Sequence, residues 1–232
     1  MAKSNKHGAL NVSNADEARA EQERLATQVR LTPSQKMPPL VCGVDVSYAT
    51  DDAPAAAAAV TIDTKTFEVV EKSLVTGHPE FPYVPGLLSF RELPLALDAI
   101  AKLSTVPELV VVDGHGYAHP QRFGLASHLG VMIDRPAIGC AKTSFVGVHT
   151  EPGENRGEWT PITDATTGEL LGTVLRTRTG VKPVFVSPGH LIDVTSAREI
   201  VLGLCPRFRL PETTRAADQL SRQALAARSL GL

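Results

Sequence analysis

The sequence lacks the excess of positive charge that marks a protein coating nucleic acid over its whole surface. It has 23 lysines and arginines against 25 aspartates and glutamates, a formal net charge of −2. This balance argues against a non-specific DNA coat protein. It does not exclude a nuclease, because active-site carboxylates lower the net charge while basic residues still line one groove.

Cysteines are few, and their positions suggest neither a disulfide framework nor a zinc site. The three present, Cys42, Cys140 and Cys205, are an odd number and widely spaced. Cys42 and Cys140 lie in apolar runs, which favours buried, reduced thiols.

Long apolar runs are absent as well. None reaches the ~18 residues needed to cross a bilayer, and the N-terminal segment lacks the apolar core of a signal peptide. We therefore expect a cytoplasmic protein with no membrane partner. With 232 residues, 43 % of them hydrophobic, the chain can bury one sizeable core. We expect a single domain over residues 1–232, monomeric, with a loose polar tail at about 1–13 and no internal repeat.

The hydrophobic pattern predicts an α/β fold, with an antiparallel meander first and alternating strands and helices after it. Such an order is typical of a mixed sheet flanked by helices. The expected strands are 40–46, 56–62, 67–75, 109–113, 136–141, 169–176 and 183–186, and the expected helices are 14–30, 87–103, 120–129, 195–204 and 213–229. We expect Pro94 to break the second helix. Residues 150–168, rich in Gly, Pro and Thr, are expected to form a long surface loop.

Two aspartates follow apolar, strand-like runs. Asp45 ends the run that starts at Val41, and Asp113 ends the run that starts at Val110. A buried charge is costly unless it is paired or bound to a cation. If the two strands are neighbours, the carboxylates form a hard-oxygen site suited to magnesium. A lone strand-end aspartate more often caps a turn, but a third acid, Glu92 in LLSFRELP, favours the metal site.

A carboxylate-bound magnesium ion supplies what phosphodiester hydrolysis needs, because it polarises the phosphate and lowers the pKa of a bound water. Nearby lysine and histidine side chains then stabilise charge and move protons. The candidates near expected strand ends are Lys142, His190, His115 and His119. The spacing of His115 and His119 also suggests zinc, but Gly116 and Pro120 argue against one helix carrying both.

Five ordered blocks of sequence resemble the endonuclease V family. They are VCGVDVSY at 41–48, PYVPGLLSFRELP at 82–94, VVDGHGYAHPQRFGLASHLGV at 111–131, GCAKTSF at 139–145 and SPGHLIDV at 187–194. The resemblance implies a ribonuclease H-like fold and cleavage of DNA that contains deoxyinosine, the product of adenine deamination. It implies magnesium as the cofactor, with Mn²⁺ able to substitute, and a nick at the second phosphodiester bond 3′ to the lesion.

The resemblance also assigns roles by matching position. Asp45 and Asp113 become the principal metal ligands, Glu92 completes the acidic centre, Lys142 and His190 lie near the scissile phosphate, and His119 contributes further. Gln121 departs from the family, which often carries a second basic residue there, and this weakens one phosphate contact.

The PYVPG block is similar to the family's wedge, formed by Pro82, Tyr83, Val84, Pro85 and Gly86. A stiff aromatic plate of this kind replaces the stacking of a base extruded from the duplex. The resemblance further implies a base pocket at Gly86, Leu88 and Gly114, with an apolar lid near Leu125. Without it, Tyr83 is better interpreted as an exposed loop aromatic and Gly114 as a turn glycine.

Alternative functions remain open at this point. The same fold acting on inosine in RNA differs by contacts to the 2′-hydroxyl, which a sequence does not display. A module that binds lesions without cutting should lack one of the metal carboxylates, whereas Asp45, Glu92 and Asp113 are all present. A structure-selective nuclease with broad lesion tolerance is a further alternative.

Overall fold

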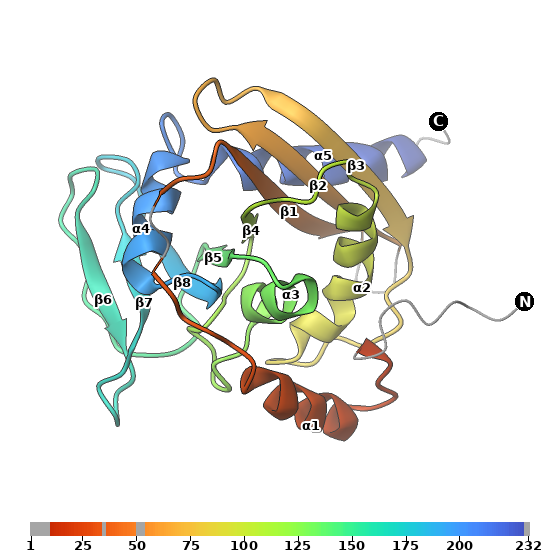
Figure 1. Cartoon of the computed structure of the whole chain (residues 1–232), viewed down its shortest axis with the longest axis horizontal. Coiled ribbons are helices and arrows are strands. Elements are labelled where there is room, and N and C mark those ends of the chain that lie inside the picture. The colour runs from red at the N-terminus through yellow and green to blue at the C-terminus, as the bar shows by residue number, and fades with distance from the viewer. Residues whose placement is uncertain (1–9, 34–35, 50–53, 230–232) are drawn as a thin grey trace, which may run out of the picture.

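The computed structural model describes residues 10–33, 36–49 and 54–229. One eight-stranded sheet with five helices runs through these residues (Figure 1). The strands are β1 (Leu40–Tyr48), β2 (Ala55–Asp63), β3 (Val69–Gly77), β4 (Val110–Val112), β5 (Ala137–Ala141), β6 (Trp159–Thr163), β7 (Leu170–Leu175) and β8 (Val184–His190). The helices are α1 (Ala15–Ala26), α2 (Leu88–Ala101), α3 (Leu125–Ile133), α4 (Val194–Gly203) and α5 (Glu212–Ser229).

The sheet is mixed, in the order β3-β2-β1-β4-β5-β8-β7-β6. The first three strands form the expected antiparallel meander, β1, β4 and β5 are parallel, and β8, β7 and β6 continue antiparallel. This confirms the predicted fold class. None of the helices in the described part of the chain has the length and apolar character needed to span a bilayer.

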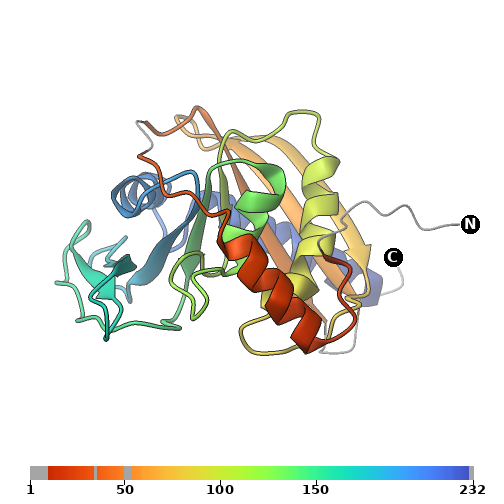
Figure 2. The ribbon, with the colours of Figure 1, turned by 60° about the horizontal axis from the view of Figure 1, so that its bottom comes forward.

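Helices cover both faces of the sheet. Alternate strand residues point to opposite faces, so Cys42 and Val112 join the core beneath α2 and α3, whereas Val41 and Val111 join the core beneath α4 and α5. Figure 2 shows α1 in front of α2 and α3, with α5 on the far side of the sheet. The central strands are therefore buried on both faces, as their aliphatic sequences predict.

The alanine run is a strand, as predicted, although its composition also suits a helix. All of its residues from Ala55 to Ala59 are fully buried in β2. Because alanine side chains are small, α2 and α5 both contact this strand from opposite faces. Both helices therefore lie close to β2, which pairs with β1, the strand that carries Asp45.

Two predictions about helices are wrong. Helix α2 continues through Pro94, because burial of Leu93, Ala96 and Leu97 on either side outweighs one lost backbone hydrogen bond. Helix α3 starts at Leu125 rather than at 120. The preceding residues form turns, with Arg122 in the left-handed region at φ 53°.

Residues 150–168 are not only a loop, because they contain β6, which pairs with β7. Their Gly and Pro content suggested a loop, but β6 is an edge strand. Pro161, which has no backbone N–H to donate, is tolerated at such an edge.

Part of the expected loose tail, residues 1–13, is packed against the core. Residues 1–9 lie outside the described part. Leu10 is buried in the core beneath α2 and α3, and Val12 packs against that core. Asn14 caps α1 by accepting hydrogen bonds from the backbone N–H groups of Asp16 and Glu17.

Helix α5 reaches β1 because residue 43 is a glycine. A Cβ atom at Gly43 would lie 2.2 Å from the backbone carbonyl carbon of Thr213 and 2.6 Å from the nitrogen of Thr214. Backbone atoms cannot move aside as the end of a flexible side chain can. Gly43 thus sets the approach of α5 to the strand that carries Asp45.

We predict that Gly43→Ala lowers the free energy of unfolding by about 1–3 kcal/mol, as overpacking in a close-packed core does. Urea denaturation measures it. Gly203→Ala is the matched control, because its new Cβ would meet only the mobile end of Met37. Equal stability losses in the two variants would contradict this account of the helix–strand contact.

Candidate active site

The register of β1 and β4 brings the two predicted aspartates together. Val44 pairs with Val112 in parallel, so the next residue on each strand is Asp45 and Asp113. Strand β4 ends at Val112, whereas β1 continues to Tyr48, so Asp45 lies inside its strand rather than at its end. Both carboxylates line one cavity of about 480 Å³.

Glu92 joins this cavity from helix α2. It is 8 % exposed, and it accepts a hydrogen bond from the hydroxyl of Tyr48 at 3.4 Å. The ring of Tyr48 in turn lies 5.0 Å beneath the guanidinium carbon of Arg91. The structure thus brings together the three acids that the sequence singled out.

Helix α5 adds Asp218, a fourth acid that sequence reasoning missed. Asp218 and Arg222 line the same cavity and are joined by a hydrogen bond of 2.8 Å. One turn along the helix, the Ser221 hydroxyl donates to Asp45 Oδ2 at 2.8 Å, and Ser47 donates to the same oxygen at 3.1 Å. Asp218 does not follow an apolar, strand-like run, and an acid in a predicted helix is usually interpreted as a solvated surface charge.

Lys142 supplies the positive charge. Its ammonium group hydrogen-bonds to Asp113 Oδ2. Burial alone would lower the pKa of Lys142, but this hydrogen bond and the charge of Asp113 raise it overall. The side chain of Arg209 donates to the carbonyl oxygen of Lys142 at 3.0 Å and thereby fixes the backbone there.

Burial and the charges of neighbouring acids disfavour ionisation of Glu92 and Asp45. Burial, reinforced by the charge of Asp45, raises the pKa of Glu92 to about 8. Burial also raises the pKa of Asp45; the hydrogen bond from Ser221 opposes this, and the charge of Asp113 adds to it. The cavity is therefore built from carboxylates that lack enough positive charge to balance them.

This donor set fits a divalent cation with hard-oxygen preference. Four carboxylates line the cavity, and a cation between them would relieve the repulsion that raises the pKa of Glu92. Among the described residues, however, no three such side chains already converge as a finished metal-binding group. The residues that would hold the ion are Asp45, Asp113, Glu92 and Asp218.

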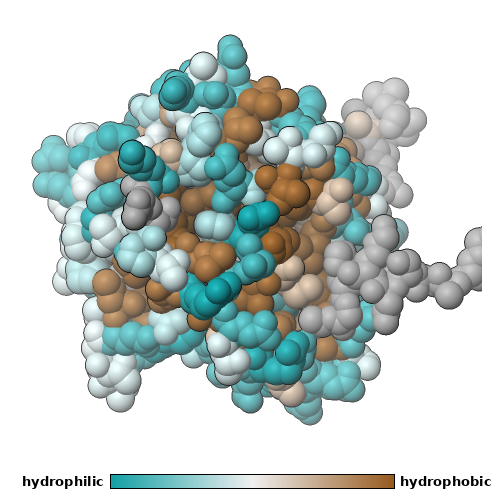
Figure 3. Space-filling view, in the orientation of Figure 1, coloured by the Kyte–Doolittle hydropathy of each residue, from teal (hydrophilic) through white to brown (hydrophobic). Residues whose placement is uncertain are grey.

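A second pocket, of about 310 Å³, adjoins the first. Its lining includes six of the eight residues expected to bind a base: Tyr83, Pro85, Gly86, Leu88, Gly114 and Leu125. Leu125 lines both cavities, and Asp113 and Gly114 are consecutive residues with one in each. Figure 3, in the orientation of Figure 1, shows apolar side chains over the middle of that face of the molecule, interrupted by hydrophilic ones.

Two exposed aromatic residues line the second pocket. Tyr83 is 66 % exposed, as a wedge requires, and Phe145 is 45 % exposed. The Phe145 ring lies 5.3 Å from the ring of His119 and 5.8 Å from that of His115, centroid to centroid. Phe145 ends the block GCAKTSF, but sequence reasoning assigned it no role, since a lone aromatic after a strand is an ordinary surface residue.

His119 lies in this second pocket rather than among the carboxylates. Burial lowers the pKa of His119 to about 4, so the ring is neutral near pH 7. Of the other wedge residues, Val84 packs against the core, and neither Val84 nor Pro82 lines the pocket.

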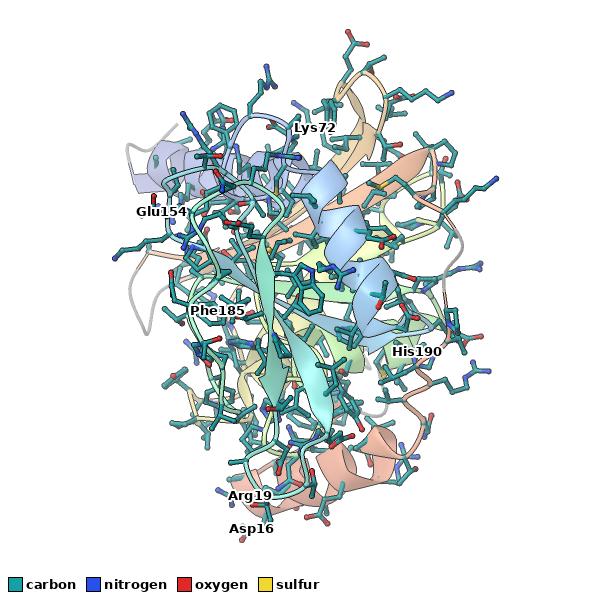
Figure 4. The ribbon with its side chains drawn as sticks, turned by 90° about the vertical axis from the view of Figure 1, so that its left-hand side faces the viewer. Asp16, Arg19, Lys72, Glu154, Phe185 and His190 are labelled. Atoms are coloured by element: carbon teal, nitrogen blue, oxygen red, sulfur yellow. The ribbon has the colours of Figure 1, made fainter. Side chains whose placement is uncertain are left out.

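His190 is not brought to the carboxylates, contrary to expectation. It pairs with Ala137 at the start of β5, whereas Lys142 follows the end of that strand. At ~3.3 Å per residue, the two lie roughly 16 Å apart along the sheet. The His190 ring instead accepts a hydrogen bond from the backbone N–H of Arg30 at 3.3 Å and lies 3.6 Å from Asp134 (Figure 4).

The chain is similar to known nucleases over most of its length. The family model described as Endonuclease V matches residues 23–219. Endonuclease V of Nocardia farcinica is 50 % identical over 224 residues, which cover 94 % of this chain and 96 % of that protein. The crystal structure of endonuclease V from Streptomyces avermitilis has a TM-score of 0.88 at 45 % identity and covers 94 % of this chain and 96 % of its own.

A more distant structure includes nucleic acid. Endonuclease V of Ciona intestinalis has been solved with a 24-mer DNA containing an inosine followed by a ribo-adenosine. It has a TM-score of 0.82 at 28 % identity, and the match covers 91 % of this chain and 98 % of that one.

The raised pKa of Glu92 predicts a pH-dependent stability in the absence of metal. The folded protein keeps a proton up to about pH 8, whereas the unfolded chain releases it near the ordinary value of 4.5. The free energy of unfolding should therefore fall as pH rises through this window. Glu92→Gln has no titrating carboxyl at this position and so does not suffer that loss. Its free energy of unfolding, relative to that of wild type, should therefore be about 1–3 kcal/mol higher at pH 8.5 than at pH 5.

Urea denaturation in EDTA at the two pH values measures this gain. Glu108→Gln, which changes an exposed carboxylate, is the control and should follow wild type. A gain for Glu92→Gln that is the same at both pH values would show that its carboxyl does not titrate in this window.

Proposed function

The chain belongs to the endonuclease V family of endonucleases, and we propose that it nicks DNA containing deoxyinosine as a step in DNA repair. Its metal is magnesium, with Mn²⁺ able to substitute. The cut falls at the second phosphodiester bond on the 3′ side of the lesion.

The adjacency of the two cavities carries this proposal. One cavity is lined by carboxylates and Lys142, and the other is largely apolar and is lined by Tyr83, Gly86 and Leu88. Such a pair suits a nucleotide whose base enters the apolar pocket while a nearby phosphate reaches the acids. The Ciona relative, solved with inosine-containing DNA, supports this arrangement.

The chemistry divides among the residues of the first cavity. A bound magnesium ion would polarise the phosphate and lower the pKa of the attacking water. Asp45 and Asp113 would hold the ion, and the Ser221 hydroxyl keeps Asp45 oriented. The ammonium group of Lys142, now paired with Asp113, lies where it can donate to an oxygen of the reacting phosphate.

Selection of the lesion belongs to the second pocket. Extruding a base costs a few kcal/mol of stacking and pairing, and less for a mispaired hypoxanthine. The exposed ring of Tyr83 fills the gap that the base leaves. Neutral His119 and the backbone at Gly86 and Gly114 offer uncharged polar groups to the base, and Phe145 offers an apolar surface.

We predict that the purified chain cuts an end-labelled duplex with one deoxyinosine when magnesium is present and fails to cut it in EDTA. Asp45→Ala and Asp113→Ala should each lower the single-turnover rate by at least about 100-fold, because the cation loses a principal ligand. Gel mapping of the product should place the nick at the second bond 3′ to the lesion.

Three companion substrates make this experiment decisive. The undamaged duplex should remain intact, and equal cutting of it would refute lesion specificity. A duplex with a ribonucleotide after the lesion and a single-stranded RNA with one inosine test the alternative target. A rate on the RNA more than tenfold above that on DNA would assign the enzyme to RNA.

For the wedge, we predict that Tyr83→Ala weakens binding to deoxyinosine duplex by roughly 5- to 50-fold, since base–aromatic stacking is worth ~1–3 kcal/mol. Tyr83→Trp should retain most of the affinity. Fluorescence anisotropy in Ca²⁺ measures binding without cleavage. Val106→Ala, a change at an exposed apolar residue outside both cavities, is the control. Unchanged affinity in Tyr83→Ala would remove Tyr83 from the recognition step.

A further inference from the structure

Helix α1 buries a polar residue in the middle of its inner face. Ala18, Gln22 and Leu25 are its three buried residues, spaced so that they share one side. Its outer side is polar, with Asp16 and Arg19 at the surface (Figure 4). Gln22 is 2 % exposed, and a buried amide is costly unless its hydrogen bonds are made.

The amide nitrogen of Gln22 donates two hydrogen bonds to two distant segments. One goes to the carbonyl oxygen of Gly86 at 2.9 Å, and the other goes to that of Phe123 at 3.1 Å. These acceptors lie 64 and 101 residues from Gln22 along the chain. One amide group of α1 therefore ties together two segments that lie far apart in the sequence.

Both segments form walls of the second pocket. Gly86 lines it directly, at the turn between the Tyr83 loop and α2, with φ 83°. Phe123 is fully buried, and the next residue, Gly124, lines the pocket as the N-cap of α3. A base that enters this pocket would have to fit between these two walls.

We propose that Gln22 is a positioning residue that holds the two walls of the base pocket at the spacing required for hypoxanthine. This inference rests on the proposed function. Gln22 touches neither the carboxylate cavity nor the pocket interior, so it acts through Gly86 and Phe123. Its loss should weaken base binding and leave the chemical step intact.

The main test variant is Gln22→Met in the full chain. Methionine has a similar shape but no donor, so the buried carbonyl group of Phe123 and the half-buried one of Gly86 lose their partner. We expect the dissociation constant for deoxyinosine duplex to rise 5- to 30-fold. The single-turnover rate at saturating enzyme and the affinity for undamaged duplex should stay within twofold of wild type. Gln22→Glu at pH 8, which places an acceptor against the same carbonyls, should lose at least as much affinity.

Leu25→Ala is the matched control for helix docking. It weakens the packing of the same helix face without removing the Gln22 hydrogen bonds. If Leu25→Ala loses as much inosine affinity as Gln22→Met, the effect belongs to α1 as a whole and the proposal is wrong. The proposal also fails if Gln22→Met lowers the saturated rate rather than the affinity, since destabilisation reduces the active fraction.

Amide hydrogen exchange separates this proposal from the proposed function. Gln22→Met should exchange faster at 84–90 and at 122–128, whether or not the chain prefers deoxyinosine. Unchanged exchange in both segments would overturn the inference. If both segments loosen but wild type shows no preference for deoxyinosine, the proposed function fails while the bridge by Gln22 stands.

Discussion

The parallel pairing of β1 with β4 is the constraint on which the rest of this site depends. Its register places Asp45 beside Asp113, and Glu92 closes the same cavity from α2. Like charges held together away from water oppose folding unless a cation balances them. Lys142 pairs with Asp113, whereas burial, with the charge of Asp45 adding to it, raises the pKa of Glu92. An arrangement of this kind costs stability, and its hard-oxygen donors suit a divalent cation.

Small residues in the sheet allow distant segments to complete the cavity. The alanine side chains of β2 let α2 and α5 lie close to opposite faces, and Gly43 lets the backbone at Thr213 touch β1. This contact fixes the start of α5, so Ser221 and Asp218 arrive next to Asp45 two turns later. The oxygen cluster is thus assembled by packing over almost the whole length of the chain.

Sequence reasoning found the parts of this site that have a local pattern. Asp45 and Asp113 each follow an aliphatic run, so their pairing could be predicted once the strands were taken as neighbours. Asp218 has no such pattern, because its place depends on how closely α5 approaches β1. His190 was misplaced because a strand followed by histidine does not reveal strand direction, and β8 runs antiparallel to β5. Strand β6 was missed because composition alone does not show that Pro161 lies at a sheet edge.

The junction of Asp113 and Gly114 joins the two cavities. One residue lines the acidic cavity and the next lines the apolar pocket, so a single peptide unit separates the two. This segment cannot shift freely, because it lies against β5 at Gly139, where even a Cβ atom would come within 2.5 Å of the Gly114 oxygen. The backbone N–H of Tyr117 also bonds to Pro188 at 2.7 Å. In the proposed function, a base held in the pocket would restrict which phosphodiester of the sugar–phosphate chain can reach the acids. The proposed cut at a fixed distance from the lesion would then depend on this rigid spacing rather than on the flanking sequence.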